Sequence, residues 1–383
     1  MVSRLGTIPS PAAPRRAIPV PEHRNREGSA MKVGIIGLPQ SGKTTLFRAL
    51  LHGAHEGALP GIAGAHHGTI SVPDPRFDYL VNLYKPKKAT PATVEFIDGA
   101  AHVSTERHKP AFGTDFFQGI RQVDALVHVI DAFSGTVDPL QAARRVDEEL
   151  LLADLMMVEG RLERLEKTLR VRKDAMPERA EHEALTLAKS LLDNETPLRL
   201  AQFTPDQEKL LRSFNFMTLK PVLVVANVDE TRLQSGEPVT ELQDYCLKHG
   251  ERFLQMCAEI EWEITQLSPE EEPEFLRAMG IEQPARLRLV REAYDALGLI
   301  TFFTFNENEV RAWMLPQGST ALEAAGRIHS DMARGFIRAE VLSWKQMEEH
   351  GSWENAKHAG AIRLEHKDYV VQDGDILYIR FKV

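Results

Sequence analysis

Eight residues near the start of the chain have the types and spacing of a phosphate-binding loop. The loop matches the pattern G-x-x-x-x-G-K-[ST] and follows an apolar run at residues 32–36. Its glycines let the backbone wrap around a phosphate with the amides turned inward, and the helical run at residues 46–51 adds the positive end of its dipole. A chance glycine-rich turn is the alternative, but strand, loop and helix agree on a nucleoside triphosphate site. The residues expected to contact the nucleotide here are Gly37, Pro39, Gln40, Ser41, Gly42, Lys43, Thr44 and Thr45.

Two oxygen-bearing side chains are expected to hold Mg²⁺ beside this loop. In loops of this pattern the lysine, here Lys43, supplies a point charge to the β- and γ-phosphates, and the Thr44 hydroxyl is a Mg²⁺ ligand. Asp98 ends an apolar run at residues 93–97, where a second carboxylate should complete the metal shell. A cap on the following turn is the alternative role for Asp98. The predicted metal ligands are therefore Thr44 and Asp98.

A third group, Asn227-Val228-Asp229-Glu230, is placed to read the base. It follows an apolar run at residues 221–226, and base-reading residues emerge at this edge of an α/β sheet. Asn227 can face N7 of a purine. GTPases usually have Asn-Lys-x-Asp here, and the aspartate accepts two protons that guanine has and adenine lacks. Glu230 is one methylene longer, so this guanine-selective pair is lost and ATP is favoured at least as strongly as GTP. A polar strand-to-helix turn is the alternative.

The composition is that of an ordinary globular chain of two or three domains. The 383 residues are 43% hydrophobic and 26% charged, and the net charge of -9 gives no overall attraction to nucleic acid, so an RNA contact needs a local patch. Cys246 and Cys257 are too few for a disulfide framework, which suits a reducing cytoplasm. No apolar stretch reaches membrane-spanning length, so we expect no membrane partner. The negative net charge goes with the expectation that DNA is not a partner either.

Residues 1–30 are rich in proline and arginine and are expected to form a disordered extension outside the fold. Met31 directly precedes the first strand, so it is a candidate for the true start; a transit peptide is the other interpretation. From there, apolar runs at residues 32–36, 93–97, 125–130 and 221–226 alternate with helical stretches. This alternation predicts an α/β fold with a mostly parallel sheet covered by helices on both faces.

A long charged segment separates the last two strands. Leu155, Val158, Leu162, Leu165 and Leu169 recur at steps of three and four, which is a heptad seam. A break at Met176-Pro177 and a second helical run predict an antiparallel helical hairpin that projects from the sheet. Its basic residues are more typical of a solvated helix surface than of an RNA-binding tip, and these residues are Arg161, Arg164, Lys167, Arg170, Arg172 and Lys173.

The last part of the chain predicts a separate α+β module. Ser268-Pro269 should begin a helix that Gly280 ends. Strands are then expected near Phe302, at residues 310–315 and at 337–342, with a helix at 319–334. The final strand alternates strictly after a turn at residues 372–374, which fits a β-grasp fold better than another layer of parallel sheet. One face of this strand is expected to carry the apolar residues Leu377, Ile379, Phe381 and Val383, and the other face Tyr378, Arg380 and Lys382.

These residues together resemble the Obg-like ATPase family, known in bacteria as YchF. The resemblance covers residues 31–383. It implies a P-loop G domain at 31–138 and 218–298, a coiled-coil insertion at 139–217 and a TGS domain, which is a ubiquitin-like β-grasp fold, at 299–383. It also implies a preference for ATP over GTP, association with ribosomes, and the pair Cys257 and Ala258 as the third base-side loop. The sequence motifs that carry the resemblance are Gly37-Leu38-Pro39, Val72-Pro73-Asp74-Pro75-Arg76, Ala226-Asn227-Val228-Asp229-Glu230, Glu309-Val310-Arg311-Ala312-Trp313, Ala325-Gly326-Arg327-Ile328-His329, Gly335-Phe336-Ile337-Arg338-Ala339-Glu340 and Lys367-Asp368-Tyr369.

The chain departs from the family pattern where hydrolysis would be controlled. The family's Asp-x-x-Gly is replaced by Asp98 followed by Gly99-Ala100-Ala101, and residues 61–65 have no hydroxyl where the family has a threonine. Residues 133–138 run through without the family's His-bearing insertion. Because phosphoryl transfer needs a group that orients water, we expect slow hydrolysis. Four histidines expected in nearby loops are more typical of exposed loop residues than of catalytic groups, and these are His66, His67, His102 and His108.

The function expected from the sequence is that of an ATP-binding, ribosome-associated protein of this family with weak ATPase activity and Mg²⁺ as cofactor. A non-hydrolysing adaptor, in which ATP only orders loops that a partner reads, is the main alternative. A small-molecule kinase shares the phosphate-binding loop but not the base-side motif or the β-grasp tail, which argue against it. No catalytic residue is assigned.

Overall fold

The apolar runs at residues 32–36, 93–97, 125–130 and 221–226 all form strands of one sheet in a computed structural model. This sheet has seven strands in the order β2-β3-β5-β1-β6-β7-β8. The five strands from β5 to β8 in that order run parallel, whereas β3 is antiparallel to β5 and β2 to β3. The predicted mostly parallel sheet is confirmed. The strands are β1 (Met31–Ile36), β2 (Leu59–Pro60), β3 (His66–Ser71), β5 (Thr93–Asp98), β6 (Ala125–Asp131), β7 (Val222–Asn227) and β8 (Arg252–Met256). The structure describes residues 31–51, 59–60, 66–98, 112–172 and 176–382, so the extension predicted at 1–30 lies outside the described residues.

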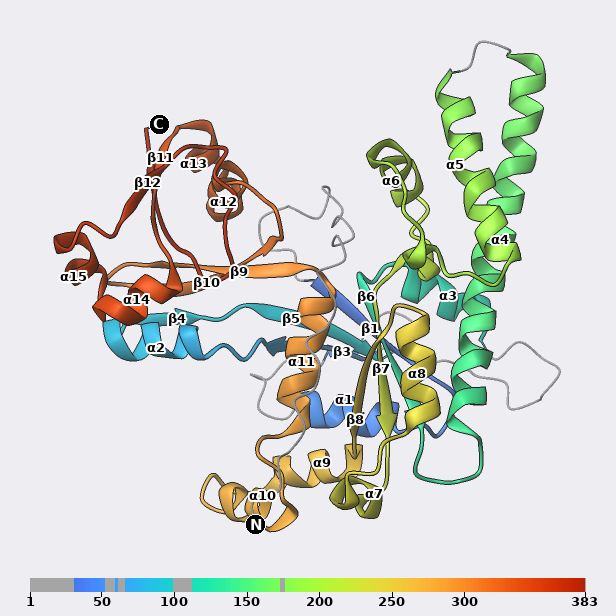
Figure 1. Cartoon of the computed structure of the whole chain (residues 1–383), viewed down its shortest axis with the longest axis horizontal. Coiled ribbons are helices and arrows are strands. Elements are labelled where there is room, and N and C mark those ends of the chain that lie inside the picture. The colour runs from blue at the N-terminus through green and yellow to red at the C-terminus, as the bar shows by residue number, and fades with distance from the viewer. Residues whose placement is uncertain (1–30, 52–58, 61–65, 99–111, 173–175, 383) are drawn as a thin grey trace.

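Helices cover both faces of this sheet (Figure 1). The helices α1, α9 and α11 contribute to the core on one face, and α3, α8 and the first half of α4 to the core on the other. Two buried faces explain why the central strands are apolar along their whole length. The helices of this region are α1 (Lys43–Leu51), α3 (Thr114–Arg121), α4 (Pro139–Val171), α7 (Glu230–Ser235), α8 (Thr240–Lys248), α9 (Ala258–Gln266), α10 (Glu272–Met279) and α11 (Ala285–Ala296).

The helix expected to start at Ser268-Pro269 begins later. In the structure α10 starts at Glu272, and the Ser268 hydroxyl accepts a hydrogen bond from the backbone N–H of Glu271 at 3.3 Å. Ser268 therefore caps a turn that precedes the helix. Gly280 ends α10 in the left-handed conformation at φ 69°, as predicted.

The charged segment forms the predicted helical hairpin, which projects from the sheet (Figure 1). The second half of α4 packs on α5 (Met176–Asp193) through the heptad residues, of which Val158, Leu162 and Leu165 are buried. The break was misplaced, because Met176 is the first residue of α5 and Pro177 lies in its first turn, where proline is tolerated. At the base of the hairpin lie η3 (Leu198–Leu200), α6 (Pro205–Arg212) and η4 (Met217–Leu219). Among the described helices, none combines the length and apolar character that crossing a bilayer requires.

The C-terminal part forms a second sheet of six strands in the order β12-β11-β13-β9-β10-β4. As predicted, Leu377 and Ile379 of β13 are buried and Tyr378 is exposed, but Phe381 is 39% exposed because it is the last residue of the strand. The prediction for Val383 lies outside the described residues. The elements are β9 (Leu299–Phe305), β10 (Glu309–Pro316), α12 (Ala321–Ile328), α13 (Ser330–Arg334), β11 (Phe336–Leu342), α14 (Trp344–His350), α15 (Trp353–His358), β12 (Arg363–Glu365) and β13 (Ile376–Phe381).

The single helix expected at residues 319–334 is two helices. His329 separates α12 from α13 because its backbone is extended, at φ -163° and ψ 140°. Its side chain accepts a hydrogen bond from the backbone N–H of Asp331 and so caps α13. A local capping bond of this kind competes with helix continuation.

The sixth strand of the C-terminal sheet comes from the first half of the chain. The short strand β4 (Lys88–Thr90) pairs with β10, and α2 (Pro75–Tyr84) precedes it. Both elements lie between β3 and β5 in the sequence. The domain bounds predicted from the resemblance remain a prediction, and this excursion shows that the contacts cross them.

Candidate functional site

The phosphate-binding loop connects β1 to α1 and depends on two glycines with positive φ. A Cβ atom on Gly37, at φ 147°, would lie 2.2 Å from the carbonyl oxygen of Val129. A Cβ atom on Gly42, at φ 94°, would lie 2.3 Å from Nδ2 of Asn227. Gln40 also has a positive φ of 63°, which costs energy for a residue with a side chain. The backbone here is therefore held in one shape by close contacts with neighbouring strands.

The loop ends at the first residues of α1, whose amides have no carbonyl partner within the helix. Lys43 begins α1, and its Nζ donates a hydrogen bond to the Leu38 carbonyl oxygen at 2.6 Å, so the ammonium group lies over its own loop. Burial lowers the pKa of Lys43, and the nearby Asp98 carboxylate opposes this effect. A bound anion would favour the charged form further.

Thr44 and Asp98 lie together, as the metal prediction requires. The Thr44 hydroxyl donates to Oδ2 of Asp98 at 3.3 Å, although 54 residues separate the two in the sequence. Asp98 is 4% exposed, and burial raises its pKa, while Lys43 and the bond from Thr44 lower it. A buried carboxylate next to a hydroxyl is the donor set that Mg²⁺ takes in P-loop proteins.

The loop also contains a buried hydroxyl group that could form a further hydrogen bond. Ser41 is 1% exposed and its Oγ has no hydrogen-bond partner within the described part of the chain. Buried hydroxyls are normally satisfied. The orphaned Oγ could therefore donate to an oxygen of a phosphate group bound in this loop.

Asn227 joins the phosphate loop to the base side of the site. Its Nδ2 donates to the Ser41 carbonyl oxygen at 3.0 Å, and its Oδ1 accepts from the backbone N–H of Ala258 at 2.9 Å. Asn227 is 5% exposed, and it ends β7 beside the ends of β6 and β8. Because an amide nitrogen carries two hydrogens, one remains for a ring nitrogen of a base.

A pocket of about 600 Å³ opens beyond Asn227, within the roughly 300–1,000 Å³ of small-molecule sites. Glu230 lies at its edge as the first residue of α7 and accepts a hydrogen bond from Gln234 at 3.0 Å. Asp229 caps the same helix. The predicted residues that line the pocket are Gly42, Thr45, Asn227, Val228, Glu230, Cys257 and Ala258.

Several residues of this pocket were not predicted from the sequence. Phe133 is 41% exposed and follows the end of β6, which is the strand next to Asn227. Its position after an apolar strand was a usable signal, since neighbouring strand ends meet at one edge of the sheet. Helices α1 and α9 supply the remaining lining residues. The sequence around those residues does not indicate that they face a pocket. The additional lining residues are Arg48, Phe133, Glu259, Ile260, Trp262 and Glu263.

The histidines were predicted in loops, but two of them lie on strand β3. His66 pairs in register with Asp98 of β5, and the Nδ1 of His67 lies 2.7 Å from the Glu95 carboxylate. The prediction was wrong because β3 has few apolar residues and was not recognised as a strand. The predictions on residues 61–65, residues 99–101, His102 and His108 lie outside the described residues.

A phosphate loop between a parallel strand and a helix, facing a pocket at the ends of the next strands, defines a P-loop nucleotide-binding protein with a G-domain sheet. Comparisons with known proteins agree. Residues 32–159 match the family described as "50S ribosome-binding GTPase", and residues 299–382 match the YchF-GTPase_C family, described as "Protein of unknown function (DUF933)".

Curated relatives cover nearly the whole chain. The "Ribosome-binding ATPase YchF" of Bacillus subtilis (strain 168) is 40% identical over 92% of this chain and 100% of its own length. The protein of the same name from Escherichia coli O157:H7 is 36% identical over 92% of this chain and 99% of its own length. The structure of the Schizosaccharomyces pombe YchF GTPase superposes with a TM-score of 0.82 at 27% identity, covering 93% of this chain and 99% of that one. The chain belongs to the YchF family.

Proposed function

We propose that the chain binds Mg·ATP at this site, hydrolyses it slowly and associates with ribosomes. The observation that carries the proposal is the double hydrogen bond of Asn227, which ties the loop suited to phosphates to the pocket suited to a base. One residue thus fixes the distance between the two halves of a nucleotide site. A binding site held by rigid elements needs little reorganisation when its ligand arrives.

The roles of the individual residues follow from their positions. The backbone of the loop from Gly37 to Thr44 would bind the phosphates, and Lys43 would exchange the Leu38 carbonyl for a phosphate oxygen. Thr44 and Asp98 would hold Mg²⁺, which when bound neutralises charge on the phosphate oxygens. Asn227 would offer its second amide hydrogen to the base.

Glu230 gives the site its expected preference for ATP, and a conservative substitution tests this. We expect Glu230→Asp to raise the affinity for GTP relative to ATP by about tenfold, because aspartate restores the reach of the guanine-reading carboxylate. Fluorescent ATP and GTP analogues titrated into both proteins measure the ratio. As the control, Glu237→Asp changes an exposed glutamate that does not line the pocket. A wild-type protein that already prefers GTP strongly would refute this role for Glu230.

A non-hydrolysing adaptor is the second candidate function, and the sequence after Asp98 favours it. The family's Asp-x-x-Gly is absent from the sequence there, so the glycine whose N–H would meet the γ-phosphate is missing at that spacing. We expect single-turnover experiments to show slow phosphate release that ribosomes accelerate. Phosphate release that stays at the buffer level with and without ribosomes would favour the adaptor instead.

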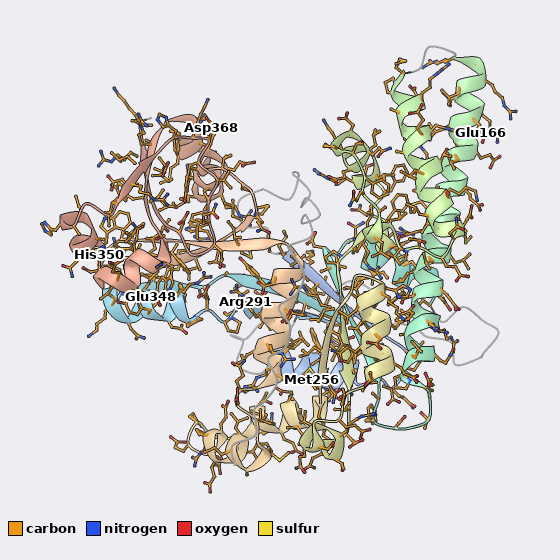
Figure 2. All side chains as sticks on the ribbon, viewed as in Figure 1. Glu166, Met256, Arg291, Glu348, His350 and Asp368 are labelled. Carbon is orange, nitrogen blue, oxygen red and sulfur yellow. The ribbon has the colours of Figure 1, made fainter. Side chains whose placement is uncertain are left out.

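The ribosome enters the proposal through the relatives, whose name is "Ribosome-binding ATPase YchF". A ribosomal partner would place the chain in the cytoplasm. The basic residues of the hairpin support direct RNA contact only weakly, because Arg161 pairs with Glu181, and Lys167 with Glu163. The acidic Glu166 lies between Arg164 and Lys167 in the sequence, and Figure 2 shows it far out on the hairpin. The solvated helix surface predicted from the sequence remains the better explanation of these charges.

A further inference from the structure

The strands β3 and β5 connect the expected Mg²⁺ ligand Asp98 to the segment that packs on the C-terminal domain. They are antiparallel neighbours, paired from His66 with Asp98 at one end to Ser71 with Thr93 at the other. The backbone N–H of Val72 then donates to the Ala92 carbonyl oxygen at 2.8 Å. The chain between these two residues leaves the first sheet entirely and returns to it.

That excursion is built into the C-terminal domain. Its strand β4 pairs with β10, and the Thr90 hydroxyl donates to Glu309 at 2.6 Å. The ring of Tyr84, at the end of α2, stacks on Phe305 with centroids 4.2 Å apart. The hydroxyl of Tyr84 also accepts from the backbone N–H of Trp353 at 3.1 Å. These contacts fix β4 and the end of α2 to the C-terminal domain.

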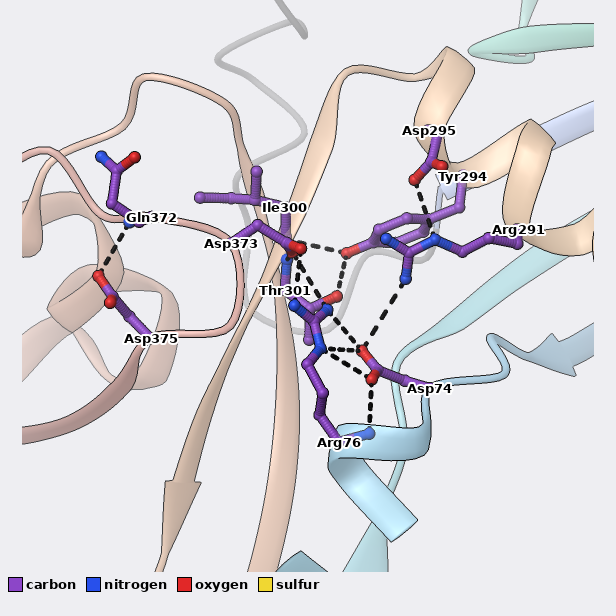
Figure 3. Close-up of polar contacts among 10 residues, drawn as sticks. All are labelled: Asp74, Arg76, Arg291, Tyr294, Asp295, Ile300, Thr301, Gln372, Asp373 and Asp375. Carbon is purple, nitrogen blue, oxygen red and sulfur yellow. Dashed lines mark hydrogen bonds and ion pairs between the residues drawn. The ribbon is translucent and has the colours of Figure 1, made fainter. Parts of the chain in front are cut away.

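An ionic joint holds the start of α2 against the C-terminal domain (Figure 3). Arg76 donates to Asp74 through Nε at 2.9 Å and through Nη2 at 2.8 Å. Its Nη1 donates to Asp373, in the turn before β13, at 2.7 Å. Burial alone would lower the pKa of Arg76, but the hydrogen bonds to the two carboxylates raise it above its ordinary value.

The turn that carries Asp373 fits closely around this arginine. Asp373 also accepts from the backbone N–H of Thr301 at 2.9 Å, and the N–H of Gly374 donates to the Thr301 carbonyl oxygen at 2.7 Å. A Cβ atom on Gly374 would lie 2.7 Å from Nη1 of Arg76. Arg291 of α11, which leads into the C-terminal domain, lies 3.9 Å from Asp74 on the other side (Figure 3).

The joint is built so that it can open without leaving a charge buried alone. The side chain of Asp74 is 5% exposed, whereas that of Asp373 is 38% exposed. If the first turn of α2 moves away from the turn that carries Asp373, Arg76 keeps Asp74 as its partner and water solvates Asp373. Leaving one partner of a buried ion pair uncompensated is what normally makes such a separation costly.

We propose that the Asp74–Arg76–Asp373 joint is a latch that couples Mg·nucleotide binding at Asp98 to the position of the C-terminal domain. The proposal rests on the nucleotide binding proposed above. Binding fixes Asp98 at one end of the β3–β5 pair, and the other end of the pair places Asp74 and Arg76 for the closed latch. The two sites are coupled through a contiguous pair of strands.

Hydrogen exchange of the full chain, with and without Mg²⁺ and a non-hydrolysable ATP analogue, tests the latch. In the wild type we expect the analogue to slow exchange of the Thr301 and Gly374 amides by about tenfold, and also to protect residues 37–45. In Arg76→Lys, which keeps the charge but cannot bind two carboxylates in a fork, protection of residues 37–45 should persist. The change at Thr301 and Gly374 should then fall below about twofold.

Two further variants make the outcome specific. Asp373→Asn retains an acceptor for the Thr301 amide and removes the charge, so it should uncouple like Arg76→Lys even if the lysine variant folds poorly. Arg161→Lys changes another two-pronged arginine–carboxylate pair, with Glu181 on the hairpin, and should retain the coupling. Coupling that survives in both latch variants, or a wild type whose C-terminal amides ignore the analogue while residues 37–45 respond, would overturn the latch. If exchange at residues 37–45 does not change either, the result contradicts the proposed nucleotide binding, on which the latch depends.

Discussion

Lys43→Ala should lose Mg·ATP affinity by about a thousandfold, which corresponds to about 4 kcal/mol of binding free energy. The reason is that Lys43 is the one cation that the loop itself holds over the expected phosphate position, where its Nζ lies 2.6 Å from the Leu38 carbonyl oxygen. In a partly buried site a charge acts far more strongly than in water. Titration with a fluorescent ATP analogue in the presence of Mg²⁺ measures the loss.

Lys248→Ala is the matched control, because Lys248 is an exposed lysine on α8. It should bind the analogue as the wild type does. The fold should survive in both variants, since Lys43 satisfies only one carbonyl oxygen of its own loop. Binding that is equal in Lys43→Ala and the wild type would remove the loop from the account.

Asn227→Ala should lower the free energy of unfolding by about 4 kcal/mol and also abolish measurable nucleotide binding, because it leaves two buried groups without a partner. These groups are the Ser41 carbonyl oxygen and the Ala258 amide, which Asn227 binds at 3.0 and 2.9 Å. Urea denaturation measures the first effect and the fluorescent titration the second.

Asn194→Ala is the control for this variant, because the Asn194 side chain is exposed and donates to the Ser190 carbonyl oxygen in its own helical turn. Its cost should stay within about 0.5 kcal/mol. If Asn227→Ala keeps the wild-type stability, the two hydrogen bonds of Asn227 cannot be what holds the phosphate loop against the base pocket.

The sequence predicted those parts of the site that depend on short-range patterns. The loop from Gly37 to Thr44 is a local motif, and Asp98 and Asn227 each follow an apolar strand, so the order of parallel strands brings them to one edge. The bond between Thr44 and Asp98 spans 54 residues and still followed from this rule.

What the sequence did not predict depends on contacts between distant segments. Strand β3 was missed because only one of its six residues, Ile70, is a large apolar residue, and its pairing with β5 makes it a strand. The same holds for α2 and β4, which lie in the first half of the chain but pack in the C-terminal sheet. Phe133 and Trp262 reach the base pocket from two elements that only the fold brings together.

The most direct test of the whole account is a crystal structure of the chain with Mg²⁺ and a non-hydrolysable ATP analogue. We expect the β-phosphate to lie within the loop from Gly37 to Thr44, with Lys43 moved from the Leu38 carbonyl to the phosphates and the base beside Asn227. A structure in which Lys43 keeps its bond to Leu38, and the nucleotide is absent from the loop or bound elsewhere, would contradict the account.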